Sequence, residues 1–335
     1  MTEPQIRKDQ GGFTLLELLV TVGIMAAVAG TATLALQDTT ARASAAAHVL
    51  MMDELNEGIM TFRALPTNNA YPDNFDSLME VAGTDATAAV PLSRLGAAFT
   101  TAADGVGDLT PFALTDALAA PLNDVGINSL RYVNTSFPAN PDGSVVGGGP
   151  EDSAGIACND LQALINSRAN AVVAGNLFLS PAANGCGFSR ELNPAATNGS
   201  EVVMVWSGGN ERVMGSEVPE PAFNAADAGG VDLANSEIGA EIMMVVGAGP
   251  SSNLFDASEV GGLTSVPVYR HVARDEYNRF FILFHIATLT DSTGAATVPD
   301  TITPVDQVVI SGVIDGAGDT KEEELGEWDG TRNTI

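Results

Sequence analysis

A long apolar run near the amino terminus constrains this chain more than any other feature. It extends from Phe13 to Leu36, contains no proline and carries a single charge, that of Glu17. At a rise of about 1.5 Å per residue, a helix over this run is long enough to span the hydrocarbon core of a bilayer, which is about 30 Å thick. We therefore expect a transmembrane helix at residues 13–36.

The segment ahead of this run has the features of a short leader. Residues 1–12 include Arg7 and Lys8 and end in Gly11 and Gly12, directly before the apolar residues. An ordinary secretory signal is cut after its apolar stretch, which the mature protein then loses. Here the natural cleavage point lies before the apolar stretch, so we expect the mature protein to keep it.

This order of residues resembles the class III signal of type IV prepilins and of type II secretion pseudopilins. Gly12 matches the last leader residue, Phe13 the first mature residue and Glu17 the fifth. The resemblance implies that a prepilin peptidase cuts between Gly12 and Phe13 and methylates the new amino group. It also implies a single-pass precursor in the inner membrane with its body in the periplasm. An inner-membrane assembly platform then adds the subunit to a filament in the periplasm or on the cell surface.

Glu17 has a physical role to explain, because a carboxylate within an apolar span usually faces a partner. Cleavage after Gly12 provides one in the amino group of Phe13. The resemblance implies that the amine of a neighbouring subunit pairs with Glu17 and sets the axial register of the filament. The alternative is a stray charge in a simple membrane anchor.

The function implied by the resemblance is mechanical. The chain is expected to be a structural subunit of a type IV pilus or type II secretion pseudopilus, in a homopolymer or heteropolymer with other pilin-like subunits, and not an enzyme. Its large body favours a minor or specialised subunit, whereas the presence of Glu17 argues against the extreme tip position. The alternative is a filament-mounted or membrane-anchored adhesin whose body binds a surface or ligand.

The helical pattern continues beyond the apolar run. Ala45, Val49, Met52, Leu55, Ile59 and Phe62 recur every three or four residues and form one apolar stripe. The helix must stop at Leu65 and Pro66, because proline cannot continue it. We expect an α+β ladle with a stalk helix at 13–65 and an exported body at 66–335. Unlike common pilins, the chain has no proline late in the apolar half, so only Gly23, Gly30 and nearby threonines weaken the helix there.

The body is expected to pack an antiparallel sheet against the stalk. Short helices are expected at 75–81, near 111–120 and at 159–173, and residues 85–195 are a candidate insertion. Strands are expected at 201–209, 241–249, 266–272, 279–289 and 307–314. The fourth of these, with Phe280, Phe281 and Phe284, should form the centre of the core.

Charge and cysteine content limit the partners of the body. The formal net charge is -28, which repels phosphate backbones and argues against nucleic-acid binding. The chain has two cysteines, Cys158 and Cys186, and an exported body would hold them in an oxidising compartment. With no histidine nearby to complete a metal site, a structural disulfide is the better interpretation.

The acidic carboxyl-terminal segment is the best candidate for a ligand site. Residues 315–329 combine glycines with carboxylates, which suit calcium, but their spacing does not fit an EF-hand. The segment resembles the end of major pseudopilins, where an acidic loop holds calcium and closes on a tryptophan. The resemblance implies Asp315 and Asp319 as ligands, and Glu322 to Glu324 less directly. The alternative is an exposed acidic tail without an ion.

No other residues form a recognisable catalytic or cofactor site. His48, His271 and His285 show neither metal-ligand spacing nor a nucleophile beside them, so all three are interpreted as structural. Residues 247–250, Gly-Ala-Gly-Pro, lack the rest of a dinucleotide fingerprint.

Overall fold

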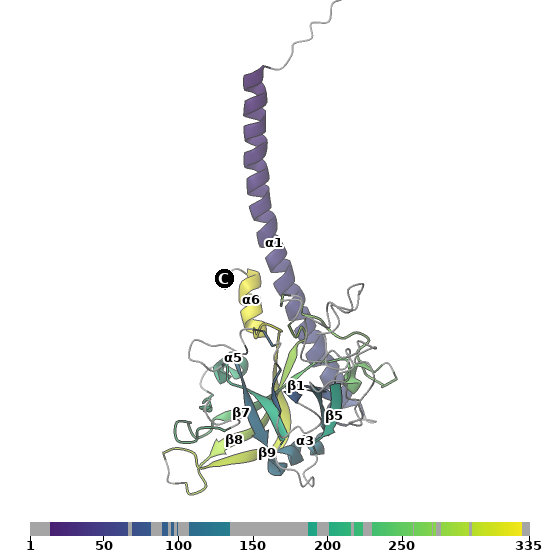
Figure 1. The fold of residues 1–335 in the computed structure, drawn as a ribbon, viewed down its shortest axis with the longest axis vertical. Coiled ribbons are helices and arrows are strands. Elements are labelled where there is room, and N and C mark those ends of the chain that lie inside the picture. Colours follow the sequence, from purple (N-terminus) through teal and green to yellow (C-terminus); the bar gives the residue numbers. More distant parts are fainter. Residues whose placement is uncertain are drawn as a thin grey trace, which may run out of the picture.

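The structure is a computed structural model. Its fold consists of one long helix followed by a sheet-rich body (Figure 1). The structure describes residues 14–65, 69–81, 89–92, 95–96, 99, 107–134, 187–192, 201–215, 218–223, 230–256, 258–269, 271–272, 276–294 and 297–329. The expected helix 159–173 and the leader residues 1–12 lie outside these ranges.

Helix α1 runs without a break from Leu15 to Ala64. Thr14 caps its first turn, and Leu65 ends it in an extended conformation that the following Pro66 favours. Figure 1 shows its first half projecting away from the body and its second half lying along it. The apolar stripe predicted from the sequence is the face that packs on the body, with Leu55 and Ile59 fully buried. The sequence therefore predicted both ends and the buried face of this helix correctly.

The described residues of the body contain nine strands in one mixed sheet. The order β3-β6-β7-β1-β4-β5 forms its main path, β8 pairs with β7 and β9, and β2 pairs with β1. The strands are β1 (Phe75–Val81), β2 (Val90–Pro91), β3 (Leu109–Leu114), β4 (Ser129–Asn134), β5 (Gly187–Glu191), β6 (Glu201–Trp206), β7 (Glu241–Gly247), β8 (Phe281–Thr290) and β9 (Thr301–Ile314). Because β1 and β4 run parallel, the expectation of a purely antiparallel sheet is wrong.

Short helices connect and flank these strands. They are α3 (Asp116–Asp124), α5 (Asn210–Met214), the 3₁₀ turn η4 (Asn253–Phe255) and α6 (Lys321–Asp329). Strands β7, β8 and β9 form the predicted carboxyl-terminal meander, and β8 is buried along almost its whole length. The expectation that this strand forms the centre of the core is confirmed.

Three local predictions are wrong. Residues 75–81 form strand β1 and not a helix: Phe75, Leu78 and Met79 have helical spacing, but the segment is buried on both faces and bonds to β2, β4 and β7. Tertiary context therefore overrides the local pattern. The expected helical patch at 111–120 is divided between β3 and α3.

The third error concerns residues 266–272, whose described part forms no strand. Pro267 has no amide to donate to a ladder. The Arg279 guanidinium donates hydrogen bonds to the carbonyl oxygens of Val266 and Pro267, and these carbonyls therefore have a side-chain partner in place of a neighbouring strand.

The candidate insertion at 85–195 contributes to the common core wherever the structure describes it. Strand β3 pairs with β6 over its whole length, and β4 pairs with β1 and β5. Phe112, Leu130 and Tyr132 are buried with the rest of the core. Whether the segment is an insertion stays a prediction, but its described strands β2, β3, β4 and β5 are part of the same sheet.

Candidate functional site

The projecting half of α1 is an uncovered apolar surface. Residues Leu15–Thr33 have a mean hydropathy of 2.0, and none of this stretch is buried by the rest of the chain. Leu15 is 83% exposed and Leu16 is 73% exposed. The stretch is long and apolar enough to cross a membrane, a property that it shares with amino-terminal signal sequences. An apolar surface of this extent needs lipid or another apolar surface to cover it.

Thr14 and Glu17 form a capping box at the start of this helix. The Thr14 amide donates to Glu17 Oε2 at 2.9 Å, and the Glu17 amide donates to Thr14 Oγ1 at 3.3 Å. The carboxylate of Glu17 thus satisfies a backbone donor at its own helix end. Its pairing with the amine of a neighbouring subunit stays a prediction.

Four of the predicted site residues lie outside the described part of the chain. These are Gly12 and Phe13 at the cleavage position, and Cys158 and Cys186 of the expected disulfide. Cleavage, methylation and the disulfide therefore stay predictions from the sequence.

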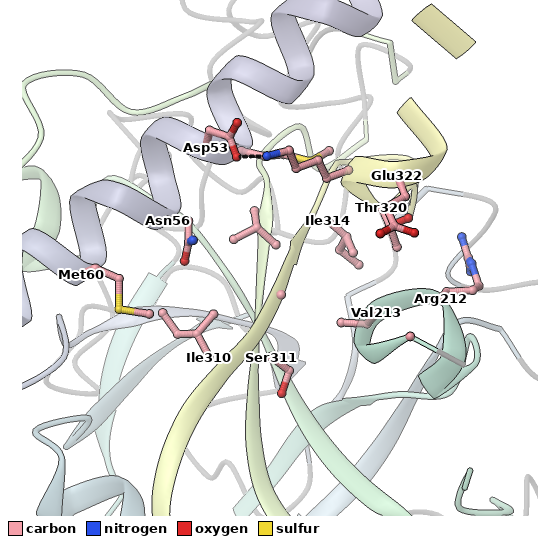
Figure 2. A pocket seen from close by; sticks show the side chains of 15 residues that line it. Asp53, Asn56, Met60, Arg212, Val213, Ile310, Ser311, Ile314, Thr320 and Glu322 are labelled. Atoms are coloured by element: carbon pink, nitrogen blue, oxygen red, sulfur yellow. Dashed lines mark hydrogen bonds and ion pairs between the residues drawn. The ribbon is translucent and has the colours of Figure 1, made fainter. Parts of the chain in front are cut away.

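A second region of interest is the junction where the carboxyl-terminal segment docks on α1. Figure 2 shows a groove here, with Asp53 and Met60 on α1, Val213 on α5 and Ile310 on β9. Lys321 also lines this groove, and its Nζ forms an ion pair with Asp53 Oδ1. The start of α6 is thereby fastened to the stalk.

Arg212 fixes the same segment from the side of α5. Its guanidinium donates to Glu323 Oε2 at 3.0 Å, to Asp108 Oδ2 at 3.0 Å and to the carbonyl of Gly318 at 2.8 Å. Glu323 also accepts from the Thr320 amide and so caps α6. One cation therefore holds the turn before α6 and the first turn of α6 together.

Asp315 organises the turn between β9 and α6. Its Oδ1 accepts hydrogen bonds from the amides of Ala317 at 2.8 Å and Asp319 at 2.9 Å. The carboxylate is fully buried, and burial together with nearby Glu324 raises the pKa of Asp315 to about 7. The alternative of an exposed acidic tail is therefore wrong for Asp315, Glu323 and Glu324, because this segment packs into the junction.

Three ionisable side chains meet inside the junction. One ligand atom from each of His48, Asp315 and Glu324 lies within 4.8 Å of the other two, and all three residues are buried. His48 Nδ1 and Glu324 Oε1 are 2.9 Å apart. The ring of Tyr269 packs on His48 with a centroid separation of 4.6 Å. We call these three residues the junction cluster.

The expected calcium ligands are dispersed by this arrangement. Asp315 and Glu324 enter the junction cluster, Glu323 binds Arg212, and Glu322 lines the groove. Asp319 is bound to Asp315 through its amide and is not part of the cluster. Calcium binding at Asp315 and Asp319 stays a prediction.

His48 is the residue whose position the sequence alone did not explain. It follows Ala45 in the apolar stripe of α1 and is 5% exposed. An ionisable residue at a buried position of an apolar stripe needs a polar partner. The occurrence of a histidine at such a position is therefore the sequence feature that indicates a partner for His48. Its partners are distant in the sequence, so spacing alone did not reveal them.

The other two histidines have structural surroundings. His271 Nε2 lies 2.6 Å from Ser44 Oγ. His285 Nε2 lies 3.0 Å from the carbonyl of Ala287, and its Nδ1 lies 3.7 Å from Glu241 Oε2. Neither belongs to the junction cluster.

Comparison with known proteins identifies the amino-terminal segment. Residues 7–33 match the family model described as the prokaryotic N-terminal methylation motif. The chain therefore carries a type IV prepilin-like class III signal peptide, as its sequence predicts. This motif implies a membrane-anchored precursor that a prepilin peptidase processes and that polymerises with pilin-like subunits. No curated protein and no solved structure matches the chain significantly.

Proposed function

We propose that this chain is a structural subunit of a type IV pilus or a type II secretion pseudopilus. Cleavage between Gly12 and Phe13 removes the leader 1–12, leaving the stalk 13–65 and the body 66–335. The mature subunit then has the form of a pilin-like ladle. The observation that carries the proposal is the division of one continuous helix into two halves. The first is apolar, uncovered and lies within the methylation motif, and the second is packed on a body.

The uncovered half suits transfer from a membrane to a filament. Lipid tails are about as apolar as the side chains of Leu15–Thr33, so little hydrophobic free energy separates burial in lipid from burial among other helices. Polar contacts must then supply much of the specificity of assembly. A carboxylate inside a membrane span is unfavourable by roughly 2.5–3.5 kcal/mol at the centre and by less near an end, so Glu17 gains from a cationic partner.

We propose that this partner is the methylated amine of Phe13 in a neighbouring subunit. The capping box leaves Glu17 at the first turn of α1, next to the position where cleavage creates the new terminus. Replacing Glu17 with glutamine keeps the size of the side chain and removes its charge. The Glu17→Gln variant should still be cleaved and inserted, yet enter filaments at least tenfold less than the unchanged chain.

The test begins with amino-terminal sequencing and intact mass of the protein from sheared filaments and, separately, from membranes. A start at N-methylated Phe13 in the filament fraction is the expected result. An uncut Met1, or a start beyond Leu36, would refute the proposed function. Glu57→Gln, on an exposed position of the same helix, is the matched control for the charge change. Equal filament entry of Glu17→Gln and Glu57→Gln would refute the role of Glu17.

A further inference from the structure

The junction cluster has the composition of a metal site. It offers one imidazole nitrogen and two carboxylate oxygens from three separate parts of the chain: α1, the end of β9 and α6. His48 is 5% exposed, Asp315 is fully buried and Glu324 is 3% exposed. Bulk water therefore solvates these groups poorly, and other groups must balance their charge.

We propose that His48, Asp315 and Glu324 bind one divalent transition-metal ion, of which Zn²⁺ is the best match. Imidazole nitrogen and carboxylate oxygen are both ordinary Zn²⁺ ligands, whereas Ca²⁺ and Mg²⁺ take oxygen ligands. The ion would join the stalk helix to the carboxyl-terminal helix. This site shares Asp315 with the calcium site expected from the sequence, but its other two ligands come from the stalk and from α6.

The charge balance favours a cation at this position. Two carboxylates and a neutral imidazole carry two negative charges, which a divalent ion neutralises. Two cations of the described part of the chain that lie at the junction are engaged with other carboxylates: Arg212 binds Glu323 and Asp108, and Lys321 binds Asp53.

An unused buried oxygen provides a second and independent observation. Asp315 Oδ1 accepts two amide hydrogen bonds, whereas Oδ2 is buried and meets no donor in good hydrogen-bond geometry among the described residues. The side chains that interact with this carboxylate are the Tyr269 hydroxyl and the Glu324 carboxyl group. A buried carboxylate oxygen without a donor is unfavourable. A metal ion among the three side chains would coordinate this oxygen.

The spacing requires the side chains to close in around an ion. In a tetrahedral Zn²⁺ site with bonds of about 2.0–2.2 Å, two ligand atoms lie about 3.3–3.6 Å apart. The ligand atoms of the cluster lie within 4.8 Å of one another, so the widest pair must approach by up to about 1.5 Å, which side-chain rotation can supply. Three protein ligands leave a fourth tetrahedral position for water.

The experiment measures Zn²⁺ binding to the full chain in detergent, produced without an affinity tag that contains histidine. After treatment with a chelator and its removal, Zn²⁺ alone is titrated by calorimetry, and bound metal is counted by elemental mass spectrometry. We expect one tightly bound Zn²⁺ per chain and a melting temperature that rises with Zn²⁺ concentration. A folded chain that binds no Zn²⁺ more tightly than micromolar overturns the proposal.

Matched variants locate the bound ion. His48→Gln and Glu324→Gln should each weaken Zn²⁺ binding at least tenfold, whereas Glu322→Gln changes the same charge at an exposed position of α6 and should leave it unchanged. Equal losses in Glu322→Gln and Glu324→Gln would indicate diffuse binding to an acidic surface and overturn the proposal. Circular dichroism of each variant distinguishes lost binding from lost folding.

Two further measurements separate this site from its competitors. Co²⁺ in place of Zn²⁺ should give visible absorption that His48→Gln alters and His285→Gln does not; His271 is not used as the control because its ring packs edge-on against His48, with centroids 4.8 Å apart. Binding of Ca²⁺ that is tighter than that of Zn²⁺ and insensitive to His48→Gln would place the ion at the acidic turn and overturn the proposal. Because every readout is made on the unassembled chain, failure here is independent of filament formation.

Discussion

The attachment of the stalk to the body can be tested with two leucines on the same helix. Leu55 is fully buried in the core, whereas Leu50 is 68% exposed. Leu→Ala at a buried site removes apolar contacts and leaves a cavity, which destabilises proteins by about 2–5 kcal/mol. We expect Leu55→Ala to lower the free energy of unfolding by about 3–4 kcal/mol, because its site lies between a rigid helix and the sheet. Leu50→Ala should stay within about 0.5 kcal/mol.

The assay is thermal and urea unfolding of the purified full chain in detergent. Fluorescence of buried Trp206 reports on the body, and circular dichroism reports on the whole chain. At about 2–4 °C per kcal/mol for domains of 150–250 residues, Leu55→Ala should lower the melting temperature by roughly 10 °C. Similar small effects of Leu55→Ala and Leu50→Ala would refute the assignment of the buried face of α1. A larger effect of Leu50→Ala would refute it more strongly.

Three further predictions concern the junction and one turn. In urea unfolding, Arg212→Met should lower the free energy of unfolding by about 2 kcal/mol, a value between those of exposed and buried ion pairs. A loss below about 0.5 kcal/mol would contradict the bridging role of Arg212. Lys321→Met should change stability by less than about 1 kcal/mol, with no effect in an Asp53→Asn background, because both side chains are about half exposed. In thermal melts, Gly126→Ala should destabilise the protein more than Gly215→Ala does. Both glycines have positive φ, but only at Gly126 would the new Cβ collide with a neighbour, the side chain of Ala70. Equal losses of stability in the two glycine variants would contradict this prediction, because they would show that the crowding at Gly126 is relieved without a loss of stability.

Local signals in the sequence predicted the long helix and the carboxyl-terminal meander. A run without proline followed by Pro66 defines α1, and an uninterrupted apolar segment defines β8. These elements need little information from the rest of the chain. Strand β1 differs, because Phe75, Leu78 and Met79 have helical spacing, and burial on both faces makes the segment a strand. The lack of a ladder at 266–272 likewise depends on Arg279, a side chain outside that segment.

The two candidate sites differ in how far the sequence reveals them. The methylation motif is one continuous segment that includes Glu17, so the order of its residues alone indicates proteolytic processing. The junction cluster joins His48 to two residues near the other end of the chain. Only the occurrence of an ionisable side chain in an apolar stripe indicated that His48 had a distant partner. Asp315 is indicated as a ligand only by the resemblance of its acidic, glycine-rich segment to the pseudopilin calcium loop, and its burial depends on the docking of α6.

The contact between α1 and α6 has a consequence for the order of folding. The first and last helices meet through His48 with Glu324 and through Asp53 with Lys321. Contacts between residues so distant in sequence form late, because closing the intervening chain is entropically unfavourable. The face of the stalk around His48 and Asp53 therefore stays incompletely covered until α6 has docked on it. A variant without α6 would leave this face exposed.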